Sequence, residues 1–187
     1  MRDHLPTDRR VRILNVAEVV RSAQAGDRVA FGVLYEHFSG YVYAILLAQL
    51  PHEDAADLVQ DVFMVALERL GSLREPAAFP GWIAAIARRR AVDAFRTERA
   101  APMRAMTEEM PDVPSRTASP HDQAAAAQVL RVIQHLPEAY RETLVLRLVQ
   151  GLTGPEIANL TGLTADSVRV NLHRGIKLLR EALGEQP

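Results

Sequence analysis

Apolar residues recur along most of this chain at the three- and four-residue spacing of amphipathic helices. Glycine, proline and capping residues divide the pattern into segments. These segments predict helices over residues 11–25, 28–50, 53–70, 80–98, 121–135 and 155–161, with a last helix that begins after Thr164. No segment alternates polar and apolar residues for long enough to predict a β-strand. We therefore expect an all-α fold.

Two of the predicted helices have a defined apolar face, which we expect to be buried. In the helix over 53–70 this face consists of Leu58, Val62, Phe63, Ala66, Leu67 and Leu70. In the helix over 80–98 it consists of Trp82, Ile83, Ile86, Ala87 and Phe95. The isoleucines beside Trp82 favour a core role for its indole ring.

The last quarter of the chain has the caps and turns of a helix-turn-helix. Thr153 and Glu156 have the spacing of a capping box, Gly162 supplies a turn, and Thr164 caps the second helix. The inward positions of that helix are Val168, Leu172, Ile176 and Leu179. Its outward side chains are suited to phosphates and base edges: Ser167, Arg169, Asn171, Arg174 and Lys177. Helical bundles also contain such helix pairs, so this segment alone favours DNA binding without establishing it.

Between residues 99 and 120 the chain is rich in alanine, proline, serine, threonine and acidic residues and has few large apolar side chains. This composition is typical of a flexible linker. It predicts a first domain over 1–98, the linker over 99–120 and a second domain over 121–187. A linker of about 20 residues would span tens of ångströms if extended.

Composition excludes several kinds of function. The 187 residues include no cysteine, which removes disulfides, thiolate metal sites and cysteine nucleophiles. The histidines are isolated, and no paired carboxylates, nucleophile–base set or glycine-rich phosphate loop is present. We therefore expect no metal, cofactor, small-molecule substrate or enzymatic activity. No signal peptide and no apolar run close to a membrane span is evident, so we expect a cytoplasmic protein without membrane insertion.

The net charge of −1 is unusual for a protein that coats DNA, so any basic surface has to be local. Basic residues are concentrated in one predicted helix and directly after it: Arg88, Arg89, Arg90, Arg96 and Arg99, accompanied only by Asp93 and Glu98. In contrast, the segment 52–61 contains four carboxylates and neither lysine nor arginine. The arginine cluster indicates either a nucleic-acid footprint or a solvated surface paired with acids.

Four blocks of the sequence, in order, resemble a bacterial sigma factor of the extracytoplasmic-function type. They are GDRVAFGVLYEHFSGYVY, EDAADLVQDVFMVALERL, FPGWIAAIARRRAVDAFR and, after the linker, the helix-turn-helix block from Leu136 to Leu183. Several motifs in the family order are more specific than the helix-turn-helix alone. The resemblance implies a transcription initiation factor of the sigma-70 family that binds core RNA polymerase, recognises two promoter elements and assists DNA melting.

The resemblance also implies roles for individual residues. Polymerase binding is assigned to Asp57, Leu58, Gln60, Asp61 and Phe63. Capture of the minus-ten promoter element is assigned to the loop residues Ser72, Arg74 and Glu75 and the helix residues Arg88, Arg89, Asp93 and Arg96. Recognition of the minus-thirty-five element is assigned to Thr164, Ser167, Arg169, Asn171, Arg174 and Lys177. The linker acids Glu108, Glu109 and Asp112 would enter the polymerase channel.

The chain departs from the family pattern at several of these positions. Arg89 stands where asparagine is common, and Val170, Asn171, Gly175 and Ile176 make the recognition helix less basic than usual. Gly175 also costs about 1 kcal/mol of helix stability relative to alanine. We expect weaker attraction to the DNA backbone and an altered base preference, with docking retained.

Two other interpretations remain open. A sigma-like decoy would bind an anti-sigma protein and no promoter, although it would not need the arginine cluster. A helix-turn-helix repressor would need a dimer and a palindromic operator, and the sequence has no heptad seam to form one. An anti-sigma factor that clamps both domains is a further partner that the resemblance implies.

Overall fold

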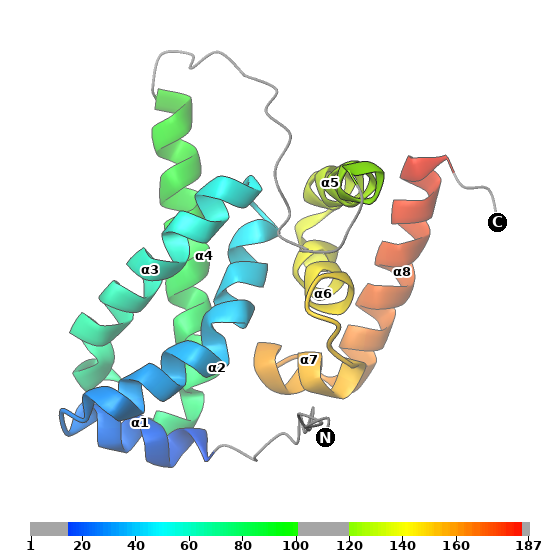
Figure 1. The fold of residues 1–187 in the computed structure, drawn as a ribbon. Helices are drawn as coiled ribbons and strands as arrows, with labels where there is room; N and C mark the ends of the chain where they lie inside the picture. The colour runs from blue at the N-terminus through cyan, green and yellow to red at the C-terminus, as the bar shows by residue number, and fades with distance from the viewer. Residues whose placement is uncertain (1–14, 101–119, 185–187) are drawn as a thin grey trace, which may run out of the picture.

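The computed structural model describes residues 15–100 and 120–184, and over this part of the chain it contains helices and no strand (Figure 1). The predicted all-α fold is thus confirmed. The linker acids Glu108, Glu109 and Asp112 lie outside the described residues, as does the segment before residue 15.

In the part of the chain that the structure describes, the first half of the molecule consists of α1–α4. The bounds are α1 (Val16–Gln24), α2 (Arg28–Leu47), α3 (His52–Arg69) and α4 (Phe79–Ala100), with 3₁₀ turns η1 (Leu70–Ser72) and η2 (Pro76–Ala78) before α4. Asp27 caps the start of α2, because its carboxylate accepts hydrogen bonds from the backbone N–H groups of Val29 and Ala30.

The second half consists of α5–α8. The bounds are α5 (Pro120–His135), α6 (Glu138–Leu148), α7 (Gly154–Thr161) and α8 (Ala165–Leu183). In Figure 1, α8 forms the outer edge of this half, and α6 lies between α8 and α2.

α2 is the central helix of the first half and packs against α1, α3 and α4. By length and composition it is apolar enough to cross a membrane, so the expectation that no apolar run approaches a span is wrong for this segment. The reason is that several helices cover α2, and side chains such as Leu34, Phe38 and Ile45 are buried on different sides of it. A buried core helix can thus have the same length and apolar composition as a membrane-spanning helix.

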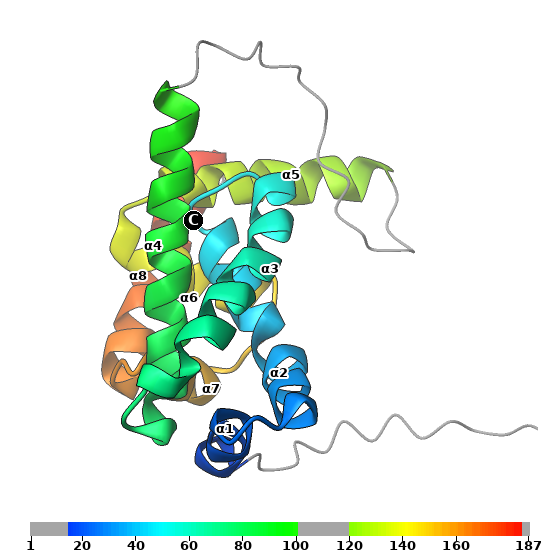
Figure 2. The ribbon, with the colours of Figure 1, turned by 90° about the vertical axis from the view of Figure 1, so that its left-hand side faces the viewer.

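The two halves pack against each other, α2 against α6 and α4 against α7, as two perpendicular views show (Figures 1 and 2). Their buried residues form one continuous core, which includes Val42 and Phe79 from the first half and Leu144 from the second. At Gly40 the approach is so close that a β-carbon would lie 2.9 Å from Oε1 of Gln150. The molecule is therefore closed, with its two halves in direct contact.

Two side chains predicted to face inward are exposed. Leu67 is 55% exposed and Phe95 is 49% exposed. Phe95 lies near the end of α4, which extends past the other helices of the first half (Figure 1). The apolar face of each helix is longer or wider than the surface that its neighbours cover, so periodicity alone overestimates burial.

Candidate DNA and polymerase interfaces

The capping box that the sequence predicts is present at the start of α7. One carboxylate oxygen of Glu156 accepts hydrogen bonds from the hydroxyl of Thr153 at 2.6 Å and from its backbone N–H at 2.7 Å. These bonds, the one from the hydroxyl first, lower the pKa of Glu156. The carboxylate thus fixes the point at which the helix-turn-helix begins.

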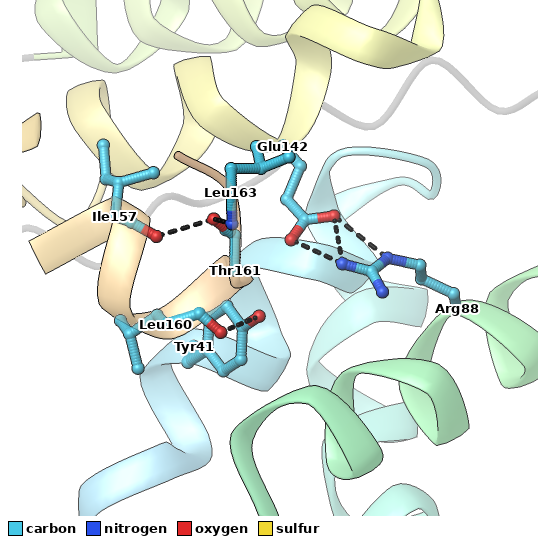
Figure 3. Close-up of polar contacts among 7 residues, drawn as sticks. All are labelled: Tyr41, Arg88, Glu142, Ile157, Leu160, Thr161 and Leu163. Carbon is cyan, nitrogen blue, oxygen red and sulfur yellow. Dashed lines mark hydrogen bonds and ion pairs between the residues drawn. The ribbon is translucent and has the colours of Figure 1, made fainter. Parts of the chain in front are cut away.

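The turn between α7 and α8 is held by short-range hydrogen bonds. Gly162 adopts a φ of +74°, a left-handed conformation that favours glycine. The hydroxyl of Thr161 donates to the carbonyl of Ile157 at 2.7 Å and accepts from the backbone N–H of Leu163 at 3.3 Å (Figure 3). The hydroxyl of Thr164 then accepts from the N–H of Ser167 and caps α8, as predicted.

α8 presents its predicted DNA-contacting residues to solvent. Thr164, Ser167, Arg169, Arg174 and Lys177 are exposed, and Asn171 is half-buried. Two of the basic side chains have nearby carboxylates. Nη2 of Arg169 lies 3.0 Å from Oδ1 of Asp166, and Nζ of Lys177 lies 3.9 Å from Oε1 of Glu181. The face is therefore accessible, with part of its positive charge offset.

Gly175 has a packing role that the sequence did not reveal. It is buried where α8 crosses α6, and a β-carbon there would lie 3.0 Å from Cδ1 of Leu144 and 3.2 Å from Cβ of Tyr140. The residue that lowers the intrinsic stability of α8 thus allows α8 to approach α6 closely.

The loop before α4 carries three of the predicted minus-ten residues, Ser72, Arg74 and Glu75, and all three are exposed. Two of them also stabilise the loop. The hydroxyl of Ser72 donates to the carbonyl of Arg69 at 2.6 Å, and the carboxylate of Glu75 accepts from the N–H of Ala77 at 3.4 Å. Among these three residues, Arg74 forms none of the described side-chain hydrogen bonds within the loop.

Gln24, at the end of α1, holds this loop from outside. Its side-chain amide donates to the carbonyls of Leu70 and Leu73 at 2.9 and 2.8 Å. Both bonds join segments far apart in sequence, so no local pattern could have identified Gln24.

The predicted minus-ten residues of α4 lie on different faces of the helix. Arg89, Asp93 and Arg96 are exposed. Arg88 is half-buried and points at Glu142 of α6, and its Nη2 lies 2.8 Å from Oε1 while its Nε lies 3.1 Å from Oε2 (Figure 3). The structure therefore brings Arg88 to the other half of the molecule and leaves Arg89, Asp93 and Arg96 exposed.

Further hydrogen bonds join the two halves. The hydroxyl of Tyr41 donates to the carbonyl of Leu160 at 3.0 Å (Figure 3). Burial, reinforced by the charge of Glu142, raises the pKa of Tyr41, so this hydroxyl remains a donor at physiological pH. The side-chain amide of Gln134 donates to the carbonyls of Leu47 and Leu50 at 2.9 and 2.7 Å and thereby caps the end of α2. We call these contacts and the Arg88–Glu142 pair the interdomain seam.

α3 presents the predicted polymerase-binding residues in two ways. Asp57, Gln60 and Asp61 are exposed, and Leu58 is half-buried. Phe63 is only 3% exposed, with its ring centroid 4.7 Å from that of Tyr35. It forms one wall of an open apolar groove lined by Phe31, Tyr35, Gln60, Phe63, Met64 and Leu67. The exposed groove side chains Met64 and Leu67 were missed as surface candidates, and the spacing of Leu67 on α3 placed it on the predicted core face.

Comparisons with known proteins agree with these features. The family model for sigma-70 region 2 matches residues 34–101, and the model for sigma-70 region 4 matches residues 126–179. The chain is 30% identical over 169 residues to the ECF RNA polymerase sigma factor SigM of Mycobacterium tuberculosis, covering 90% of this chain and 84% of SigM. The chain belongs to the extracytoplasmic-function (ECF) sigma factors of the sigma-70 family.

This sigma factor is also 30% identical over 172 residues to BldN, an ECF RNA polymerase sigma factor of Streptomyces coelicolor. The match covers 89% of this chain and 65% of BldN, so the chain spans less than two thirds of that relative. The solved structure of CnrH in complex with the cytosolic domain of CnrY has the same fold, with a TM-score of 0.60 at 23% identity, and covers 92% of this chain and 99% of CnrH.

Proposed function

We propose that this sigma factor binds core RNA polymerase, directs it to promoters with two defined elements and assists DNA melting. The observation that carries the proposal is the pairing, in family order, of an exposed recognition helix α8 with an arginine-rich α4 that follows a braced loop. A protein with these two surfaces has one contact for duplex DNA and another for a separated strand. We propose that it acts in the cytoplasm, as a factor and not as an enzyme.

The proposed DNA contacts are the residues that the family resemblance implies, most of which are exposed. On α8 they are Thr164, Ser167, Arg169, Asn171, Arg174 and Lys177, which would read the minus-thirty-five element in the major groove. In the first half they are Ser72, Arg74 and Glu75 of the loop and Arg88, Arg89, Asp93 and Arg96 of α4, which would hold the minus-ten element.

We propose that polymerase binds the acidic surface of α3 through Asp57, Leu58, Gln60 and Asp61. These residues face solvent wholly or in part, and Phe63 supports them from the groove wall. A carboxylate-rich helix suits a basic partner surface.

The closed arrangement bears on how this factor engages DNA. While Arg88 forms its paired hydrogen bonds with Glu142, its Nε and Nη2 donors are occupied by the carboxylate. We therefore infer that the interdomain seam has to open before Arg88 can bind the minus-ten element through its Nε–Nη2 edge. An anti-sigma factor, the family partner, would keep the factor inactive if it held the two halves together.

The proposal is tested by binding of the full chain to purified core polymerase. Asp61→Lys reverses a charge on the proposed surface and should weaken binding about tenfold or more, since like charges across an interface are costly. Glu36→Lys, an equal charge change at an exposed position of α2 outside that surface, should bind like the wild type.

Three results would contradict the proposal. Absence of polymerase binding would rule it out. Polymerase binding without transcription from any promoter would favour the decoy interpretation. Tight binding to a palindromic duplex without polymerase would favour a repressor.

A further inference from the structure

A pocket of about 350 Å³ lies where the end of α2 and the start of α3 meet α5 and the end of α6. Both halves of the molecule build it. The first half contributes Tyr43, Leu47, His52 and Ala56, and the second half contributes Ala126, Leu130 and Val149. Because the lining comes from both sides, the complete pocket exists only while the two halves are in contact.

The pocket is continuous with the interdomain seam. Leu47 lines the pocket, and its backbone carbonyl accepts the hydrogen bond from Gln134 of α5 at 2.9 Å. Leu130, on the opposite wall, precedes Gln134 by about one turn of α5. A molecule in the pocket therefore contacts both halves beside a bond that joins them, and it loses contacts when the halves separate.

The lining is apolar except for Tyr43 and His52, whose ring centroids lie 5.9 Å apart in an edge contact. No hydrogen bond within the described residues engages the hydroxyl of Tyr43. Burial raises the pKa of Tyr43, so the hydroxyl stays protonated at physiological pH and is available as a donor. An apolar pocket of this volume with few polar groups is typical of small-molecule sites.

The charges around the pocket select against an anion. The first three turns of α3, which form one wall, carry the carboxylates of the segment 52–61, and this segment contains neither lysine nor arginine. Negative charge beside a low-dielectric wall repels an anionic ligand. The lining therefore fits an uncharged molecule with an apolar body and one acceptor for the hydroxyl of Tyr43.

We propose that this pocket binds an uncharged, mainly apolar small molecule with one hydrogen-bond acceptor, and that the bound molecule holds the two halves together. Such a ligand binds the closed molecule better than the open one, so it shifts the population towards the closed form. The consequence for DNA rests on the proposed function: a closed molecule keeps Arg88 paired with Glu142, and the ligand therefore weakens binding of minus-ten single strands. Binding in the pocket itself does not depend on that function.

The first test compares three probes of similar size, acetylnaphthalene, ethylnaphthalene and naphthoate, by calorimetric titration of the full chain. Acetylnaphthalene has a carbonyl acceptor and should bind most tightly. Ethylnaphthalene lacks the acceptor and should bind about three- to tenfold more weakly, the range expected for one net hydrogen bond. Naphthoate is anionic and should bind more weakly than acetylnaphthalene because of the carboxylates on α3.

Matched variants locate the binding site. Ala126→Phe places a ring in the pocket and should raise the Kd of acetylnaphthalene about tenfold or more, whereas Ala125→Phe, at an exposed position of α5 outside the lining, should leave it unchanged. Tyr43→Phe removes the donor and should abolish the difference between acetylnaphthalene and ethylnaphthalene. Tyr35→Phe makes the same change in α2 outside the pocket and should preserve that difference. Thermal unfolding identifies any variant that fails to fold, and the exposed Ala126 variant stands if the Tyr43 variant fails.

The second test measures the effect of the ligand on the closed form. Saturating acetylnaphthalene should weaken binding of minus-ten single strands about two- to fivefold in the wild type and not in Ala126→Phe. Four outcomes would overturn the proposal: no binding of acetylnaphthalene, equal binding of naphthoate, an equal loss with Ala125→Phe, or a dimer of the chain that Ala126→Phe dissociates. If the chain binds no strand even without the probe, the proposed function is contradicted, and the calorimetric titrations still decide whether the pocket binds its ligand.

Discussion

The two helices that we propose bind DNA are presented differently. α8 exposes most of its predicted contacts. The positive charges of Arg169 and Lys177 are offset by carboxylates of the same helix. α4 has one predicted contact, Arg88, engaged by Glu142 of the other half, while Arg89 and Arg96 remain exposed. The closed molecule thus has the proposed minus-thirty-five surface accessible and the proposed minus-ten surface partly occupied by an internal contact.

The largest expected effect comes from releasing Arg88. Glu142→Gln removes a charge-assisted contact worth about 1.5–3 kcal/mol, which corresponds to a shift of roughly 10- to 150-fold towards the open form. We expect a larger radius of gyration and tighter binding of minus-ten single strands. Small-angle scattering and strand-binding assays measure the two changes.

Two variants sharpen that result. Arg88→Gln also breaks the pair and should open the molecule, but it should not improve strand binding because the DNA contact is lost. Glu138→Gln, at an exposed position of the same helix, should change neither property. Unchanged dimensions in the Glu142 variant would show that the pair does not hold the halves together.

The packing of α8 gives the next largest effect. Gly175→Ala should destabilise the protein by about 1 kcal/mol, because overpacking of about 1–3 kcal/mol exceeds the gain in helix propensity. The same substitution at Gly32, an exposed position with no atom within 4 Å of a new β-carbon, should stabilise it by about 0.5–1 kcal/mol. Urea unfolding compares them, and equal signs would show that Gly175 has no packing role.

A smaller effect is expected at the start of α8. Asp166→Asn releases Arg169 and removes a negative charge near the proposed DNA surface, so minus-thirty-five duplex binding should tighten about two- to fivefold at low salt. Glu181→Gln makes the same charge change beside Lys177, where the ion pair is longer, and should have less effect. Equal affinities for the two variants in a fluorescence anisotropy titration would place DNA away from the first turn of α8.

The smallest effect concerns Glu156, whose pKa is lower in the folded protein than its ordinary value of 4.5 because of the bonds from Thr153. A carboxyl of this kind stabilises the fold above its unfolded pKa and loses that contribution as the pH falls through its folded pKa. The Tm advantage of the wild type over Glu156→Gln should therefore be present at neutral pH and shrink below pH 4.5. Thr153→Val, which removes one of the two donors, should be intermediate. A difference that does not vary with pH would exclude the ionised cap.

Local signals predicted much of the fold. Asp27, Thr153, Gly162 and Thr164 set helix ends through groups within a few residues, so their positions could be inferred from spacing. The seam could not, because Arg88 and Glu142 meet only after the two halves pack. The surface residues of each site were predicted by family resemblance, and most of them are exposed or half-buried; Phe63 is buried, and Arg88 is paired with Glu142.

The expectations failed where one sequence pattern is compatible with two different structural environments. Leu67 and Phe95 occur at apolar helical spacing although each is about half exposed, and α2 has the composition of a membrane helix because protein surrounds it. By helix propensity alone, Gly175 predicts a less stable α8, yet it permits α8 to cross α6 closely. Only the positions of neighbouring helices distinguish these cases.

The most direct test of the account is run-off transcription by purified core polymerase on a library of promoter fragments, with and without this sigma factor. We predict initiation at discrete sites that share two separated motifs, only when the factor is present. Identical transcripts with and without the factor, in reactions where it is shown to be folded, would contradict the account.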